Sequence, residues 1–88
     1  HAKLRGMVTL KVFVEEDCWS CSESRRLIAE IAPQFPQVTM EVVDLSQGQR
    51  PRNIFAVPTY MLNDKIISLG NPYPTELRRK LLDALEAM

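Results

Sequence analysis

The stretch from Met7 to Val14 constrains the fold more than any other part of the chain. It reads Met-Val-Thr-Leu-Lys-Val-Phe-Val, an almost continuous run of apolar and β-branched residues. Such a run is typical of a central β-strand that is covered on both faces by other elements. The acidic segment Glu15-Glu16-Asp17 ends it. The run therefore predicts an α/β fold in which this strand lies in the middle layer.

The remainder of the chain alternates between helical and extended patterns. The expected elements are, in order, strand 7–14, helix 18–32, strand 38–44, a helical turn or two at 52–55, strands 59–62 and 65–69, and a C-terminal helix with Thr75 as its N-cap. The order β-α-β-(α)-β-β-α predicts a parallel first pair of strands and an antiparallel closing hairpin with its turn at Asn63–Asp64. We therefore expect a three-layer α/β sandwich: a four-stranded mixed sheet with helices on both faces.

Length and charge limit the possible classes of function. The 88 residues are enough for one domain, which we assign to residues 7–88, with residues 1–6 as an N-terminal extension or tag remnant. Eleven Lys and Arg residues balance eleven Asp and Glu residues, so neither nucleic acid nor an anionic membrane is an expected partner. No apolar run approaches the ~18 residues of a membrane span, and no secretory signal is visible. The default expectation is a cytoplasmic monomer.

The two cysteines carry most of the chemical information. Cys18 and Cys21 enclose Trp19-Ser20 where the first strand passes into the first helix. On one helical turn, residues three apart have Cβ atoms about 5–6 Å apart, near the range that a disulfide accepts. Cys18 is expected at the helix N-terminus, where N–H groups and the helix dipole favour a thiolate, and Cys21 is expected to be more buried. This asymmetry indicates an exposed attacking thiol and a shielded resolving thiol.

The three acidic residues before Cys18 oppose this effect, because nearby negative charge disfavours a thiolate. The helix dipole contributes only ~0.3–1 kcal/mol. Three carboxylates can cancel that contribution unless their side chains point away into solvent. The sequence leaves both the sign and the size of the net effect open.

A second segment, Val57-Pro58-Thr59, stands at the entrance to the third strand. Proline at the first residue of a strand costs no hydrogen bond of the sheet, and an X-Pro bond can be cis. Together with Cys18-x-x-Cys21, a glycine after the hairpin (Gly70) and a terminal amphipathic helix, this segment resembles the thioredoxin-like superfamily. The likeness covers about residues 7–88, and the short chain is similar to the small, glutaredoxin-sized thioredoxins of bacteria and archaea.

The resemblance implies a thiol–disulfide oxidoreductase that acts on protein disulfides. Cys18 would be the nucleophile, Cys21 would resolve the mixed disulfide, and Pro58 would be cis beside them. In that family the backbone before the proline, here Val57, pairs with an extended substrate chain. No bound cofactor is implied, and the electrons would come from an external reductase or thiol. The residues expected to contact substrate are Trp19, which we expect to be exposed, Ser20, Val57, Pro58, Thr59 and Gly70.

The sequence departs from the family pattern at three places. The residues between the cysteines are Trp-Ser, where thioredoxins have Gly-Pro and glutaredoxins often have Pro-Tyr, so no reduction potential transfers from either group. Thioredoxins carry a buried Asp where this chain has Val12, so a proton acceptor for Cys21 is missing. Gly70-Asn71-Pro72-Tyr73 replaces the Gly-Gly-x-Asp type of segment that holds glutathione in glutaredoxins, which argues against glutathione binding.

Other interpretations of the two cysteines remain open. They are structural thiols in one interpretation and half of a zinc site in another, although structural zinc needs four ligands and only the distant His1 adds to the pair. In a third, the domain docks a partner through a Trp19–Pro58 surface without turnover. In a fourth, the two thiols hold a soft ion such as Cu(I).

Overall fold

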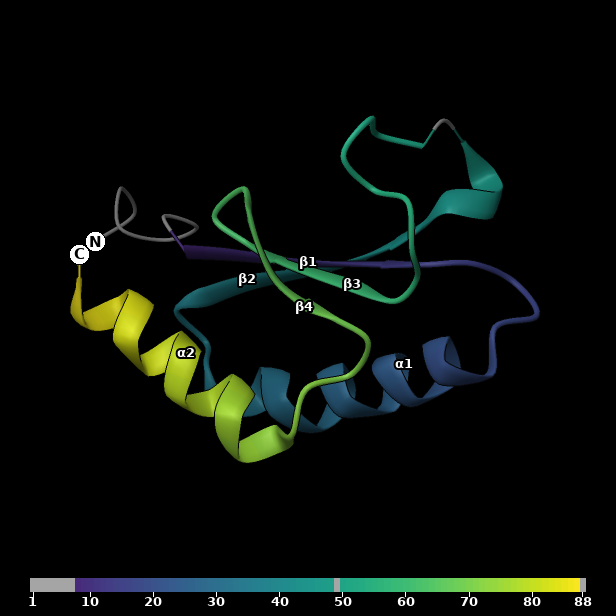
Figure 1. The fold of residues 1–88 in the computed structure, drawn as a ribbon. Coiled ribbons are helices and arrows are strands. Elements are labelled where there is room, and N and C mark those ends of the chain that lie inside the picture. Colours follow the sequence, from purple (N-terminus) through teal and green to yellow (C-terminus); the bar gives the residue numbers. More distant parts are fainter. Residues whose placement is uncertain (1–7, 49, 88) are drawn as a thin grey trace.

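A computed structural model describes residues 8–48 and 50–87 of the chain (Figure 1). Its strands are β1 (Val8–Val14), β2 (Val38–Asp44), β3 (Thr59–Leu62) and β4 (Lys65–Leu69), and they form one sheet in the order β2-β1-β3-β4. β1 pairs in parallel with β2 and antiparallel with β3, and β3 and β4 form an antiparallel hairpin. The predicted four-stranded mixed sheet is confirmed. The predicted domain boundary at Met7 lies outside the described residues.

In the described part of the chain, two α-helices and two short 3₁₀ helices accompany the sheet. Their bounds are α1 Trp19–Ile31, η2 Ala32–Gln34, η3 Leu45–Gln47 and α2 Pro74–Glu86. The prediction of Thr75 as N-cap is wrong, because Pro74 is the first helical residue and Tyr73 is the N-cap. Proline is favoured at that position, since its φ angle is already helical and the N–H that it lacks would have no partner within the helix.

The main core lies between the sheet and the two α-helices, which cover the same face (Figure 1). Alternate residues of β1 point into this core, as the two-residue period of a strand requires. The fully buried members from the strand and the helices are Val8, Leu10, Val12, Val14, Ile31, Leu77 and Leu81. This shared core fixes α1 and α2 to the same face of the sheet.

The opposite face has a smaller cover than we predicted. Phe13 and Met61 pack there against Leu45 of η3 and against Ile54, and among residues 8–48 and 50–87 no α-helix lies on this side (Figure 1). The helical turns predicted at 52–55 are a simple turn, closed by the Ile54 N–H on the Pro51 carbonyl at 3.1 Å. Pro51 and Pro58 flank this segment and lack the backbone N–H that a longer helix through them would need. Helices lie on both faces of the sheet as predicted, with α1 and α2 on one face and the 3₁₀ helix η3 on the other.

The hairpin turn is the one that the sequence predicts. Asn63 and Asp64 have φ angles of 49° and 68°, the left-handed region that a two-residue type I′ turn requires and that Asn and Asp tolerate. The Asn63 N–H donates to the Thr9 carbonyl at 2.9 Å, which ties the turn to β1. Within the two described ranges, no helix is both long and apolar enough to cross a membrane.

Candidate active site at the Cys18–Cys21 disulfide

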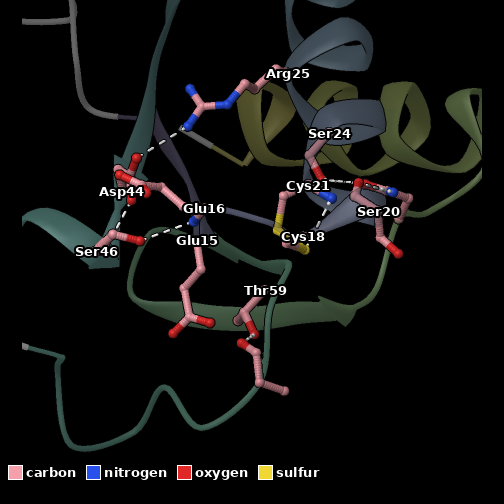
Figure 2. Close-up of a disulfide and its surroundings, with 12 residues drawn as sticks. Glu15, Glu16, Cys18, Ser20, Cys21, Ser24, Arg25, Asp44, Ser46 and Thr59 are labelled. Carbon is pink, nitrogen blue, oxygen red and sulfur yellow. Dashed lines mark hydrogen bonds and ion pairs between the residues drawn. A yellow bond between two sulfur atoms is a disulfide. The ribbon is translucent and has the colours of Figure 1, made fainter.

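Cys18 and Cys21 are joined by a disulfide at the N-terminus of α1 (Figure 2). Their Cα atoms are 5.1 Å apart, within the normal range for a disulfide. Cys18 is the N-cap of the helix and is partly exposed, whereas Cys21 is only 2% exposed. The positions expected for the two cysteines are therefore the ones observed.

The start of α1 directs N–H groups at Cys18. The Cys21 N–H donates to Cys18 Sγ at 3.2 Å, and the same N–H group lies 3.1 Å from the Cys18 carbonyl oxygen. When the disulfide is opened, this N–H and the positive end of the helix dipole stabilise a thiolate on Cys18 relative to the thiol. Local geometry thus favours a thiolate on Cys18.

The acidic segment before Cys18 borders a hollow of about 470 Å³ beside the disulfide. The residues that line it are Glu15, Glu16, Asp17, Cys18, Trp19, Cys21, Ser22 and Arg25. Glu15 forms an ion pair with Arg50, and Arg25 forms one with Asp44 at 3.4 Å. Within residues 8–48 and 50–87, Glu16 and Asp17 form no ion pair. The negative charge that opposes a Cys18 thiolate is therefore partly neutralised.

The predicted substrate-contacting residues lie in three segments: residues 19–20 at the start of α1, residues 57–59 at the entrance to β3, and Gly70 after β4. Trp19 is 81% exposed, which confirms the expected exposure. The Val57–Pro58 peptide bond is cis, and the Pro58 carbonyl accepts from the Gly70 N–H at 2.8 Å. Gly70 has a φ of +94°, a conformation that favours glycine. The hydrogen bond between Gly70 and Pro58 holds the segment before β3 against the segment after β4.

Two of the predicted contact residues are engaged within the protein itself. Thr59 is fully buried, and its hydroxyl donates to the Ala56 carbonyl at 2.7 Å, so the side chain shapes the loop before β3 (Figure 2). The carbonyl of Ser20 accepts from Asn71 Nδ2 at 2.8 Å. Both contacts stabilise the site from within.

Sequence analysis missed a polar cluster behind the first turn of α1: Ser24, Tyr60 and Asn71. The Tyr60 hydroxyl donates to Asn71 Oδ1 at 2.7 Å, and the Ser24 hydroxyl lies 2.5 Å from the same oxygen. Burial raises the pKa of Tyr60 above 10.0, an effect that a hydrogen bond with Ser24 partly offsets. One available signal was the place of Ser24 on the buried face of α1, between Cys21 and Ile28.

The cluster occupies the neighbourhood of the acid that thioredoxins carry. Val12, which stands in place of that Asp, is the direct antiparallel partner of Tyr60. Both side chains belong to the main core, together with Cys21. The hydroxyl of Tyr60 thus brings a polar group to the face of the sheet on which Val12 carries none.

Comparison with solved structures shows which fold this is. The chain is similar to thioredoxin of Fasciola hepatica, with a TM-score of 0.73 and 20% identity over 93% of this chain and 85% of the other. It is also similar to thioredoxin of Trypanosoma brucei brucei, with a TM-score of 0.69 and 24% identity over 94% and 79% of the two chains. The oxidised form of thioredoxin O2 from Arabidopsis thaliana has a TM-score of 0.69 and 21% identity over 93% and 80%.

The chain therefore has a thioredoxin-like fold. No protein-family model matches the sequence, and no curated protein matches it significantly. The Cys18–Cys21 disulfide lies at the start of α1 within this fold.

Proposed function

We propose that the protein is a thiol–disulfide oxidoreductase that exchanges its Cys18–Cys21 couple with the disulfides of other proteins. One observation carries the proposal: the disulfide links a partly exposed N-cap cysteine to a cysteine that is only 2% exposed. An external disulfide can approach Cys18 but not Cys21. The couple is thus arranged for attack from one sulfur and resolution by the other.

The reaction consists of two exchanges. In the first, the Cys18 thiolate attacks one sulfur of the substrate disulfide, forming a mixed disulfide and releasing the other substrate sulfur as a thiolate, which takes up a proton. In the second, the Cys21 thiol loses its proton and attacks Cys18 Sγ, which re-forms the Cys18–Cys21 disulfide and releases the second substrate thiol. Two electrons pass to the substrate, and the reverse sequence oxidises a dithiol.

The segment before β3 is where we place the substrate chain. Among the described residues, no hydrogen bond involves the backbone of Val57. The next residue, Pro58, is held in place by the hydrogen bond from the Gly70 N–H to its carbonyl. Backbone groups that have no partner within the protein can pair with an extended peptide. The exposed Trp19 ring, beside Cys18, supplies apolar contact area.

The electron donor in this proposal is an external reductase or a small thiol, as the sequence analysis expects, and the protein itself contributes only the two cysteines. The cytoplasmic location and the monomeric state stay predictions. Both concern the cellular setting of the reaction, and neither changes its two steps.

A trapping experiment tests the proposal. Cys21→Ser removes the resolving thiol, so the reduced variant should accumulate a mixed disulfide with a disulfide-containing protein such as insulin, seen by mass spectrometry and lost with dithiothreitol. The double variant Cys18→Ser, Cys21→Ser is the control and should form none. Equal amounts of adduct in the two variants would contradict the proposal and leave a thioredoxin-like binding module as the better account.

A further inference from the structure

Asn71 links three parts of the molecule that are far apart in the sequence. Its Nδ2 donates to the carbonyl of Ser20, between the two cysteines, at 2.8 Å. Its Oδ1 accepts from the hydroxyl of Tyr60 on β3 at 2.7 Å and lies 2.5 Å from the hydroxyl of Ser24 on α1. One amide group therefore connects the Cys18–Cys21 turn to the sheet.

The anchors of this amide are themselves rigid. Tyr60 and Ser24 are both fully buried. The residue before Asn71, Gly70, is held by its N–H on the Pro58 carbonyl at 2.8 Å. The Ser20 carbonyl is thus tied to side chains and backbone that do not depend on the disulfide.

We propose that Asn71 is a positioning residue that keeps Cys18 and Cys21 close together in the dithiol form and so makes the couple more reducing. The proposal rests on the proposed function only in requiring that this disulfide opens and closes. Asn71 acts through the Ser20 carbonyl and takes no part in the exchange itself.

The direction of the effect follows from what holds the turn in each state. In the oxidised protein the disulfide itself holds the two cysteines together. In the reduced protein only α1 and the Asn71 amide do so, and a pre-organised pair of thiols has a higher effective concentration towards each other. Loss of the Asn71 amide therefore increases the conformational freedom of the dithiol form more than that of the disulfide form. The equilibrium then moves towards the dithiol.

A purely structural role gives a different result. If Asn71 only stabilised the fold, its loss would lower the free energy of unfolding equally in the oxidised and reduced proteins. By thermodynamic linkage, the equilibrium constant between dithiol and disulfide would then stay unchanged. That equilibrium constant therefore separates the two roles.

The test is equilibration of the protein with mixtures of reduced and oxidised glutathione: the protein disulfide and two glutathione thiols give the protein dithiol and glutathione disulfide. Asn71→Ala should shift this constant towards the dithiol by roughly three- to tenfold, as expected for a lost hydrogen bond. A tenfold shift equals a potential about 30 mV less negative. Tyr60→Phe should shift it less and in the same direction, because the bond from Asn71 to Ser20 remains. Ser24→Ala should also shift it in that direction, because the Ser24 hydroxyl contacts both Asn71 Oδ1 and, at 3.2 Å, the Ser20 carbonyl.

Gln34→Ala is the matched control. Gln34 is also a bridging amide, which donates to the Glu30 carbonyl and accepts from Arg78 Nε at 2.9 Å, at the other end of α1. Its loss should leave the constant within twofold of the wild-type value, about 10 mV.

The inference would be overturned if Asn71→Ala had the same dithiol–disulfide equilibrium constant as the wild type. If that variant does not fold, a wild-type equilibrium constant in the double variant Tyr60→Phe, Ser24→Ala would overturn it. Neither result would affect the proposed function, provided that Cys21→Ser still traps substrate. A wild-type protein whose thiols never form the disulfide would remove both proposals.

Discussion

Tyr60 shows how a single residue serves both the fold and the site. Its ring fills the core opposite Val12, and its hydroxyl reaches the amide of Asn71. Phenylalanine at this position would fill the same space and leave one acceptor lone pair of Asn71 without a donor. The hydroxyl therefore contributes to the geometry of the site more than to the packing of the core.

The same hydroxyl makes the free energy of unfolding depend on pH in the alkaline range. Burial raises the pKa of Tyr60 above the 10.0 of an ordinary tyrosine, so the folded protein retains a proton that the unfolded chain releases. The contribution is fully present below pH 10 and is lost as the pH rises through the folded pKa. Urea unfolding of the oxidised protein between about pH 8 and about pH 11 should show this decline, and Tyr60→Phe should reduce it.

Tyr73→Phe is the control for this measurement, because the Tyr73 ring is 78% exposed. Its pH profile should follow that of the wild type. The same alkaline slope in wild type and Tyr60→Phe would show that the buried hydroxyl makes no contribution.

At the scale of elements, sequence patterns determined the strands more completely than the loops. The bounds of β2, β3 and β4 are the predicted ones, because alternation, β-branched residues and turn residues act over a few neighbours. The cover of the second face could not be predicted, since it depends on how η3 and Ile54 meet the sheet. A chain segment with few apolar residues carries no periodic signal of such a contact.

The site divides in the same way. The cysteines, the proline segment and Gly70 could be found because their spacing in the sequence forms a pattern. The role of Asn71 could not, because its partners Ser20 and Ser24 are 51 and 47 residues away. Only the crossing of α1 over the sheet brings them together.

The C-terminal helix offers a paired test of packing. Leu81 is fully buried under the sheet, whereas the adjacent Leu82 is 51% exposed. Leu81→Ala should lower the free energy of unfolding by about 2–5 kcal/mol through lost burial and the cavity left behind. Leu82→Ala should cost less than about 1 kcal/mol, because about half of the side chain stays in water and its removal leaves no enclosed cavity. Urea unfolding of both variants checks this, and equal losses would contradict the orientation of α2.

At the scale of the whole molecule, the fold brings three separate segments to one site. The end of β1 leads into the cysteine turn, the segment before β3 supplies Val57 and Pro58, and the segment after β4 supplies Gly70 and Asn71. The two α-helices lie on one face of the sheet, and the start of α1 presents Cys18 at the surface. The architecture thus combines a shielded sulfur with an accessible one.

The most direct test of this account is catalytic reduction of insulin disulfides with dithiothreitol as the electron donor. The wild-type protein should accelerate the reaction over many turnovers, and Cys18→Ser, which lacks the nucleophile but keeps the fold, should be no faster than dithiothreitol alone. A wild-type rate equal to that of Cys18→Ser would show that the Cys18–Cys21 couple does not exchange with protein disulfides.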